Sequence, residues 1–356
     1  MQSVVDIFLA LVAIDSPSYE EDRLALFLES ELLSLGFTTS YDEAHNLYGF
    51  LPGEGEPLLF NAHMDTVALA VGAKPIIKDG IIATDGTTAL GADDKAAIAA
   101  MIWALRKIKE QNLAHPPLTI LFTTAEEEGL VGASKIQAER LKSVKWGYTL
   151  DVTGPVGLAV IEAAYHDMIE ATFYGKAAHA GFEPEKGVSA IMMASRAIVG
   201  MQLLRIDEET TANVGSLVAE GAKNIVSAEA KLVLEARSLK KEKLEEQTNA
   251  MKDALKEAAD FYGGEVVITH SHLYGGYAHS PDSGVLQQFK DACKTLGLAF
   301  GTKTTLGGSD ANIFNSHGVP TLAISSGYSG AHSTAERIAI ADLEALASVT
   351  LELMSL

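Results

Sequence analysis

Cysteine, basic residues and long apolar runs are all scarce in this 356-residue sequence. Cys293 is the only cysteine, which excludes a disulfide framework and an all-thiolate metal site and favours a reducing compartment, so we expect a cytoplasmic protein. The 27 Lys and Arg residues face 47 Asp and Glu residues, and the formal charge of -20 argues against nucleic acid or an anionic membrane as a partner. No apolar run approaches the ~20 residues of a membrane span, so we expect no contact with a membrane.

Apolar residues make up 47% of the chain, which is enough for sizeable cores in two structural units. Short apolar runs alternate with helical patterns, and they cover residues 57–61, 118–122, 146–150 and 320–325. Such runs are typical of buried strands in a largely parallel sheet. The sequence therefore predicts an α/β fold with a mostly parallel sheet and helices on both faces.

Three local patterns predict where elements begin and turn. Ser18 with Glu21 three residues later matches a capping box before a helix that runs to Gly36. An Asp-Gly pair between two isoleucine pairs predicts a hairpin over residues 76–83, which we expect at the edge of the sheet. Residues 96–108 are apolar enough for a buried helix with Asp93 and Asp94 at its N-terminal end.

From about residue 165 the pattern changes. Strands are predicted at 169–173, 213–219, 228–237 and 265–270, with helices at 188–204 and 244–262. This β-α-β-β-α-β order is the ferredoxin-like split unit. The earlier pattern then resumes with helices at 284–296 and 341–353. We therefore predict a discontinuous domain over residues 1–164 and 276–356, interrupted by a second domain over 165–275.

Side chains that can bind metals follow four of the predicted strands. They are His63, the run Glu126-Glu127-Glu128, Asp151 and, after a Gly- and Ser-rich loop, His332. Ligand sites in open α/β sheets lie beyond the carboxyl ends of the strands, so these side chains can converge there. Asp93 joins them from the predicted start of a helix.

This mixed nitrogen and oxygen donor set is typical of Zn²⁺, with Mn²⁺ or Co²⁺ as alternatives. One zinc needs only three such ligands plus water, so five of them predict two zinc ions with Asp93 as the bridging carboxylate. Asp65 lies two residues beyond His63 and points the same way from an extended chain. We expect Asp65 to orient the imidazole of His63 and not to bind the metal.

Neighbouring Glu126 and Glu127 diverge from an extended chain, so one is predicted to bind metal while the other accepts a proton. Water between two zinc ions has its pKa lowered towards ~7, and a nearby carboxylate can pass its proton to a leaving amine. The pattern thus predicts amide hydrolysis without a covalent intermediate.

The sequence leaves two alternatives open. Glu127 and Glu128 could exchange roles, and residues 307–310 either shape a substrate pocket or form a turn before a helix.

Several ordered motifs together resemble the clan of aminoacylase, carboxypeptidase G and peptidase T, and are most similar to the peptidase T-like tripeptide aminopeptidases. The motifs are Ala62-His63-Met64-Asp65-Thr66-Val67, Gly91-Ala92-Asp93-Asp94-Lys95, Glu126-Glu127 before Gly129, Gly132-Ala133, and the late His332. The resemblance covers nearly the whole chain. It implies a zinc exopeptidase-like catalytic domain over 1–164 and 276–356, with a ferredoxin-like lid and dimerisation domain over 165–275.

The resemblance also implies roles for individual residues. One zinc would be held by His63, Asp93 and Asp151, the other by Asp93, Glu127 and His332, and Glu126 would be the general base. In the lid, His179 would stabilise the oxyanion in the active site of a partner subunit, and Asn224 and Arg237 would hold polar groups of the substrate. A homodimer through the lid is therefore part of the expectation.

The expected activity is zinc-dependent hydrolysis of small peptides, with removal of N-terminal residues from tripeptides. The alternatives are an N-acyl amino acid deacylase or carboxypeptidase of the same clan, and a metal-bearing peptide-binding protein without catalysis. The Gly-x-Ser-x-Gly, His-Glu-x-x-His, Gly-x-Gly-x-x-Gly and P-loop motifs do not occur, which argues against those enzyme classes.

Overall fold

The computed structural model describes residues 2–355, and they group into two compact units. The first contains the chain up to Ile161, Ala278–Thr304 and everything from Ser309 onward. The second contains Glu162–Tyr277 and the short stretch Thr305–Gly308. The prediction from the sequence placed residues 305–308 in the first domain. Within the described residues, no helix is long and apolar enough to cross a membrane.

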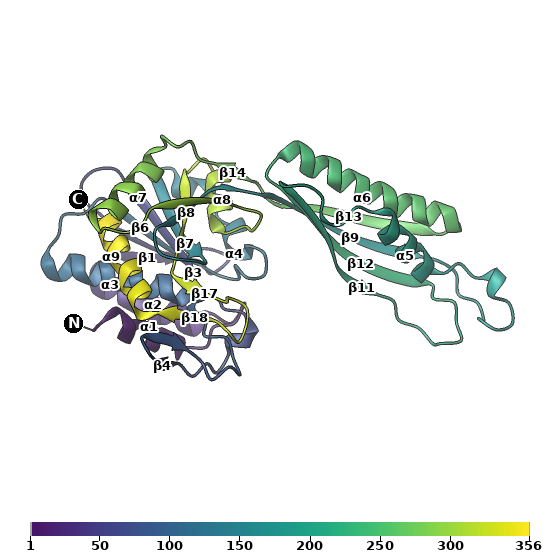
Figure 1. Ribbon diagram of the computed structural model, residues 1–356, viewed down its shortest axis with the longest axis horizontal. Coiled ribbons are helices and arrows are strands. Elements are labelled where there is room, and N and C mark those ends of the chain that lie inside the picture. The colour runs from purple at the N-terminus through teal and green to yellow at the C-terminus, as the bar shows by residue number, and fades with distance from the viewer. Residues whose placement is uncertain (1, 356) are drawn as a thin grey trace. The chain divides into compact units, whose positions relative to one another are not determined.

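The central sheet of the first unit has the strand order β1-β2-β6-β3-β7-β16-β8-β14, with β15 paired to β8 (Figure 1). Its strands are β1 (Thr38–Tyr41), β2 (Leu47–Leu51), β3 (Leu58–His63), β6 (Leu118–Thr123), β7 (Trp146–Val152), β8 (Leu158–Ala163), β14 (Tyr277–Ala278), β15 (Gly301–Thr305) and β16 (Thr321–Ser325). The four neighbours β6, β3, β7 and β16 are parallel. The predicted mostly parallel sheet is thus confirmed at its centre, while the flanking strands are antiparallel.

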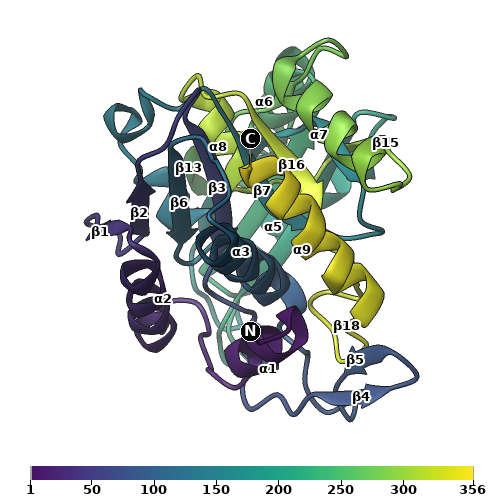
Figure 2. The same ribbon diagram turned by 90° about the vertical axis from the view of Figure 1, so that its left-hand side faces the viewer.

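Helices cover both faces of this sheet. They are α1 (Val4–Val12), α2 (Asp22–Leu35), α3 (Ala92–Gln111), α4 (Val131–Ser134), α7 (Gly284–Thr295), α8 (Asp310–Ser316) and α9 (Ile340–Met354). Figure 2 shows α1, α3 and α9 side by side on one face, where Phe60 of β3 joins their apolar core. The next residue, Asn61, contacts Asp310 of α8, because successive side chains of a strand point to opposite faces. The polar face of β3 therefore meets α8.

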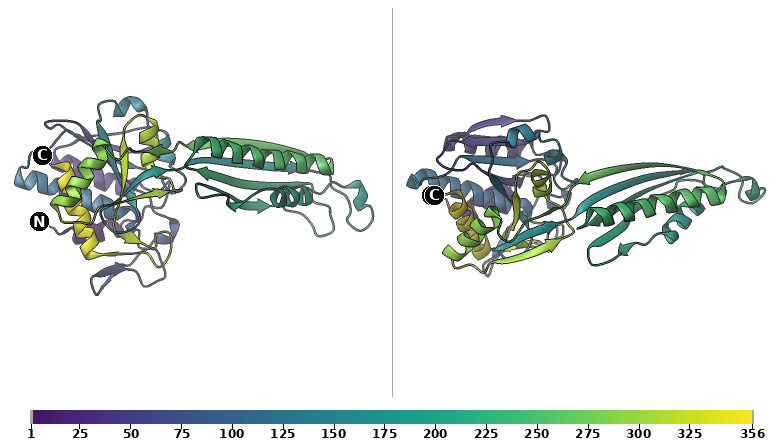
Figure 3. Two further views of the ribbon diagram at one scale, coloured as in Figure 1. Left: turned by 45° about the horizontal axis from the view of Figure 1, so that its top comes forward. Right: turned by 90° about the horizontal axis from the view of Figure 1, so that it is seen from above.

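The second unit is a five-stranded sheet with the order β10-β11-β12-β9-β13. Its strands are β9 (Tyr165–Tyr174), β10 (Leu204–Arg205), β11 (Thr210–Val218), β12 (Glu229–Ser238) and β13 (Glu265–Tyr274), and its helices are α5 (Ala190–Gly200) and α6 (Lys241–Tyr262). Both helices pack side by side on one face, as Figure 3 shows. The order β9-α5-β11-β12-α6-β13 agrees with the predicted ferredoxin-like unit, and the short β10 is an addition.

Two local predictions were wrong. The hairpin of β4 (Ile76–Lys78) and β5 (Ile81–Ala83) forms, but not at the edge of the central sheet. It belongs to a separate four-stranded sheet with β17 (Tyr328–Ser329) and β18 (Arg337–Ala339), because β18 pairs with β5. The local sequence specifies the turn but not the partner strand.

The capping box at Ser18 does not form either. Helix α2 begins at Asp22, and its first residues receive no side-chain cap. The Ser18 hydroxyl instead donates to the Asp65 carboxylate at 2.7 Å, and Glu21 accepts the backbone N–H groups of Tyr19 and Ala125. Tertiary partners have replaced the local cap.

Candidate metal centre

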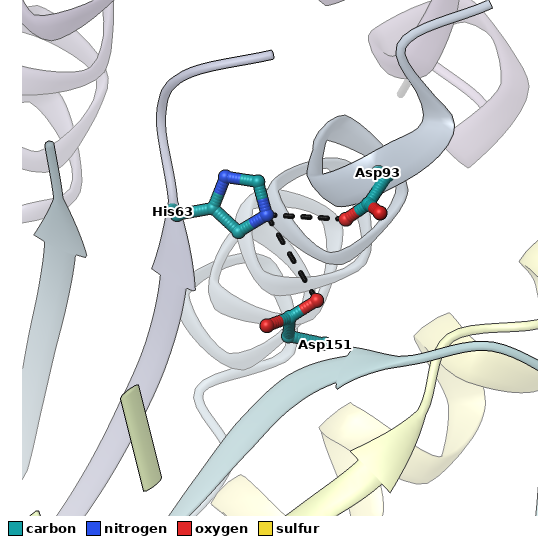
Figure 4. Close-up of side chains that lie close together, drawn as sticks. All are labelled: His63, Asp93 and Asp151. Carbon is teal, nitrogen blue, oxygen red and sulfur yellow. Dashed lines mark hydrogen bonds and ion pairs between the residues drawn. The ribbon is translucent and has the colours of Figure 1, made fainter. Parts of the chain in front are cut away.

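His63, Asp93 and Asp151 converge at the carboxyl end of the parallel strands (Figure 4). His63 is the last residue of β3, Asp151 lies in the neighbouring β7, and Asp93 lies in the first turn of α3. The His63 Nε2 atom is 3.1 Å from Asp93 Oδ1 and 3.9 Å from Asp151 Oδ1. Asp151 was predicted to follow its strand, whereas β7 runs on to Val152 and carries this side chain within it. The three donor atoms lie on three separate elements and face a common point.

A second group of donors shares Asp93. The His332 Nε2 atom is 2.8 Å from Glu127 Oε2 and 3.4 Å from Asp93 Oδ2. Each group of three offers ligand atoms that lie within 4.8 Å of one another. The two oxygens of Asp93 therefore face different histidines, which is the arrangement that a carboxylate bridging two cations requires.

The donor set fits a pair of cations. Asp93, Asp151, Glu126 and Glu127 crowd around only two imidazoles, and the Glu127 Oε1 atom is buried without a hydrogen-bond partner in the described chain. Burial and then the charge of Asp93 hold the pKa of the Asp151 carboxyl well above its usual range. Buried carboxylates that repel one another are stabilised when they coordinate metal ions.

Nearby carboxylates stabilise the protonated form of both histidines, and a bound metal ion would replace that proton. Hydrogen bonds to Asp93 and Glu127 raise the pKa of His332 to about 10. Burial opposes the charged form of His63, yet hydrogen bonds to Asp65 and Asp93 outweigh it and keep the pKa of His63 well above its ordinary value. Since a metal binds the neutral imidazole, a metal ion that bound at these residues would release protons.

Asp65 lies behind His63 and also contacts the segment that carries the glutamates. The His63 Nδ1 atom is 2.9 Å from the Asp65 carbonyl oxygen and 3.3 Å from Asp65 Oδ1. The Asp65 carboxylate accepts the backbone N–H groups of Glu126 at 2.9 Å and Glu127 at 3.1 Å. One buried residue therefore orients an imidazole, chiefly through its backbone carbonyl, and fixes the backbone of both glutamates through its carboxylate.

The glutamates lie in a turn and not in an extended segment, which corrects the sequence-based argument. Strand β6 ends at Thr123, Ala125 has a φ of 46°, and residues 127–129 form a turn. Glu127 points to His332 from this turn, whereas Glu128 is exposed. The structure therefore places Glu127, and not Glu128, in the cluster. Burial and then the charge of Asp151 hold the pKa of the Glu126 carboxyl well above its usual value.

Tyr328 was missed by the sequence analysis. Its buried hydroxyl lies 3.0 Å from Asp93 Oδ1 and 3.1 Å from Asp151 Oδ1. Burial and the charge of Asp93 hold the pKa of this phenol well above its ordinary value, so it is a hydrogen-bond donor to these carboxylates. A lone tyrosine after a glycine carries no signal of this role in the sequence.

Asp310 was left between two interpretations, and the structure gives it a third. Ser309 caps α8 in a capping box with Asn312, so this stretch does contain turn chemistry. The buried Asp310 carboxylate accepts from Thr123 Oγ1 at 2.5 Å and from Asn61 Nδ2 at 3.3 Å. Because Asn61 lies two residues before His63 on the same face of β3, Asp310 supports the strand that delivers a metal-binding candidate.

In the second unit, His179 and Asn224 lie on adjacent segments. His179 pairs with Ile225 in an antiparallel bridge, and the Ala180 N–H donates to the Asn224 carbonyl at 2.9 Å. The His179 Nδ1 atom accepts the N–H groups of Gly181 at 3.1 Å and Phe182 at 3.2 Å. A ring nitrogen that accepts carries no proton, so the proton of the neutral ring is on Nε2.

Arg237 is engaged within its own unit. Its Nη2 atom is 2.9 Å from Glu235 Oε2, and Nη1 is 3.4 Å from both the Tyr274 hydroxyl and the Leu306 carbonyl oxygen. Glu235 Oε2 also lies 3.0 Å from His166 Nε2, and His166, followed by Arg237, lowers the pKa of Glu235 to about 2. The guanidinium is thus oriented by a carboxylate that stays charged.

Comparison with known proteins agrees with this geometry. The model of peptidase family M20/M25/M40 matches residues 59–355. Among curated proteins, an uncharacterized protein YqjE of Bacillus subtilis is 39% identical over 346 residues, covering 94% of this chain and 93% of its own.

Two solved structures are similar over almost their whole length. Aminopeptidase PepT from Bacillus cereus has a TM-score of 0.88 and 39% identity, and the match covers 99% of this chain and 97% of that one. A tripeptidase from Staphylococcus aureus has a TM-score of 0.92 and 38% identity, with 99% and 96% covered. The resemblance to peptidase T-like enzymes that the motifs indicated is thereby confirmed.

Proposed function

Because this chain belongs to peptidase family M20/M25/M40 and is a metallopeptidase, we propose that it removes N-terminal residues from small peptides, tripeptides in particular. The observation that carries the proposal is the pair of three-residue donor groups joined by Asp93. The two similar structures are described as an aminopeptidase and a tripeptidase, which favours this specificity over deacylation.

We further propose that both groups hold zinc, one ion with His63, Asp93 and Asp151 and the other with Asp93, Glu127 and His332. When bound, the ions would lower the pKa of a water molecule and polarise the carbonyl of the scissile amide. Asp65 keeps His63 in the tautomer with a free Nε2, because the opposite ring nitrogen faces Asp65 oxygen atoms. Mn²⁺ or Co²⁺ would suit the same donors.

In this proposal Glu126 is the general base. Its carboxylate accepts the proton of the attacking water and passes it to the leaving amine. Asp65 supports this role by holding the Glu126 backbone N–H, while Glu127 is directed to His332. Burial raises the pKa of Glu126, which makes its carboxylate a better proton acceptor.

His179 is proposed to stabilise the oxyanion of the tetrahedral intermediate, in the active site of the partner subunit of a homodimer formed through the lid. Its tautomer supports the role, because the Nε2–H that remains is a hydrogen-bond donor. Asn224 on the adjacent segment and Arg237, oriented by Glu235, are proposed to hold polar groups of the peptide.

Mixing two inactive variants tests the action of His179 across subunits. Neither His179→Ala nor Glu126→Ala alone should turn over peptide, and a mixture after subunit exchange should recover part of the activity. Recovery is expected because a mixed dimer contains one site with Glu126 and with the partner's intact histidine. If the mixture stays as inactive as its components while mixed dimers are detected by mass, the histidine acts within its own chain. An active His179→Ala variant would show that the histidine takes no part in the reaction.

A substrate panel tests the activity itself. The zinc-loaded protein is offered free tripeptides, dipeptides, N-acetylated tripeptides and N-acyl amino acids, and the products are identified by mass. Release of the first residue from free tripeptides, with acetylated forms untouched, is the expected result. Turnover of N-acyl amino acids without cleavage of tripeptides would establish the deacylase alternative, and release of the C-terminal residue the carboxypeptidase alternative. Zinc binding with no turnover of any substrate would favour a peptide-binding protein.

A further inference from the structure

Glu336 is a buried carboxylate that none of the roles above uses. Its side chain is 1% exposed, and it accepts three backbone hydrogen bonds. The N–H groups of Leu90 and Gly91 each donate to Oε2 at 2.8 Å, and the N–H of Asp93 donates to Oε1 at 2.9 Å. Both oxygens of one carboxylate are therefore committed to the segment that ends in the shared metal-binding candidate.

The three donors lie in the segment that leads into α3, where Asp93 and Asp94 have non-helical backbone angles, so these N–H groups have no helical partners. The residue at the N-cap is Gly91, which has no side chain that could accept from them. An accepting group must therefore come from another part of the fold, because a buried backbone N–H without a partner is costly. Glu336 supplies this group from more than 240 residues away along the chain, at sequence separations of 243 to 246.

Glu336 and His332 belong to one loop, residues 330–336, between β17 and β18. The Glu336 N–H donates to the Ser333 carbonyl at 3.2 Å, and the Ser333 hydroxyl donates to the Gly330 carbonyl at 2.7 Å. A Cβ atom on Gly330 would come within 2.8 Å of the Ala335 carbonyl oxygen, so the loop closes tightly on itself. The position of Glu336 and that of His332 are thereby linked.

From this geometry we propose that Glu336 is a positioning residue that fixes the backbone of Asp93 relative to the loop of His332, and so sets the spacing of the two metal sites. Ionic hydrogen bonds to backbone N–H groups are the strong ones, and three of them act here on a segment of four residues. The proposal rests on the two metal sites proposed above. It adds a carboxylate that fixes the position of Asp93 relative to His332 without binding either metal ion.

The two sites should depend on Glu336 unequally. The group of His63, Asp93 and Asp151 depends on Glu336 only through the Asp93 backbone. The group of Asp93, Glu127 and His332 depends on it twice, because the Glu336 carboxylate fixes Asp93 and, through the same hydrogen bonds, ties the end of the His332 loop to residues 90–93. Loss of this carboxylate should therefore weaken the second site more than the first.

The experiment is a zinc titration of the metal-stripped full chain against a chromophoric chelator, for the parent and for Glu336→Gln. The glutamine amide can present its oxygen to only one side, so its NH₂ group faces the N–H donors on the other. We expect the zinc-binding step that His332→Ala removes to lose roughly 10- to 100-fold in affinity, as for other groups that orient metal ligands. The other zinc-binding step should change less, and kcat should fall with little change in KM.

A matched control separates positioning from general destabilisation. Ile338→Val trims a buried side chain of β18 two residues from Glu336 and removes no hydrogen bond, so it should lower the melting temperature yet leave both zinc affinities as in the parent. Glu336→Asp keeps the charge but shortens the side chain, and it provides the same test with an intermediate effect if the glutamine variant does not fold.

The proposal is overturned if either Glu336 variant folds and binds both zinc ions as tightly as the parent, or if Ile338→Val weakens zinc binding equally. A parent chain that binds no zinc at all would contradict the metal sites themselves. That result is distinct, because it is seen before any variant is compared.

Discussion

Replacing Glu126 with glutamine is expected to lower kcat by ~10²–10⁴-fold while both zinc ions stay bound, because general-base catalysis typically contributes that much. The amide has nearly the shape of the carboxylate but accepts no proton from water. Glu126 is not part of either donor group, so metal content should remain at two ions per chain. The measurement is steady-state turnover of a tripeptide together with metal analysis of the same preparation.

The neighbouring Glu128 is the control for this substitution. It lies two residues further along the same turn, it is exposed, and Glu128→Gln makes the same chemical change there. This variant should retain parental kcat and zinc content. Parental turnover by Glu126→Gln would remove the residue from its assigned role. A loss of zinc in that variant would instead make Glu126 a ligand.

Replacing Asp93 with asparagine is expected to disrupt both metal sites at once. The two carboxylate oxygens face His63 and His332 separately, and an asparagine keeps only one oxygen. Affinity should fall at both steps of a zinc titration by more than the roughly 10- to 100-fold typical of losing an outer partner, and activity should fall with it.

His332→Ala gives the comparison that identifies a bridge. It removes a donor from one group only, so a single zinc-binding step should be lost while the site of His63 and Asp151 persists. The bridging role is wrong if Asp93→Asn also loses only one step. The test is independent of catalysis, because a titration counts ions whether or not the chain turns over peptide.

The sequence predicted those parts of the molecule that local patterns specify. The apolar runs that became β3, β6, β7 and β16 carry their own signal, because buried parallel strands are continuously hydrophobic. The alternation of Ala230, Leu232, Leu234 and Ala236 likewise indicated β12, and these four side chains are buried. The hairpin turn at Asp79 was also local, and both it and Gly80 adopt positive φ.

Predictions from local patterns were wrong where a backbone N–H or a side chain forms its hydrogen bond with a residue far away in the sequence. Ser18 has the right spacing to cap α2, yet its hydroxyl is bound to Asp65, 47 residues away. The turn after β6 could not be read from the run of three glutamates, because Ala125 is held in its positive-φ conformation by contacts that include Glu21. The choice between Glu127 and Glu128 depended on that turn.

The sequence by itself determined which residues could form the metal centre, because His63, Asp93, Glu127, Asp151 and His332 occur in recognisable motifs beside predicted strands and a predicted helix start. Only the tertiary structure decided how they meet. One oxygen of Asp93 faces each histidine, the Tyr328 hydroxyl contacts the carboxylates of Asp93 and Asp151, and Glu336 accepts the backbone N–H of Asp93. The physical reason is that these contacts join segments between 30 and 243 residues apart in the sequence. Hydrogen bonds between such segments leave no periodicity or spacing in the sequence.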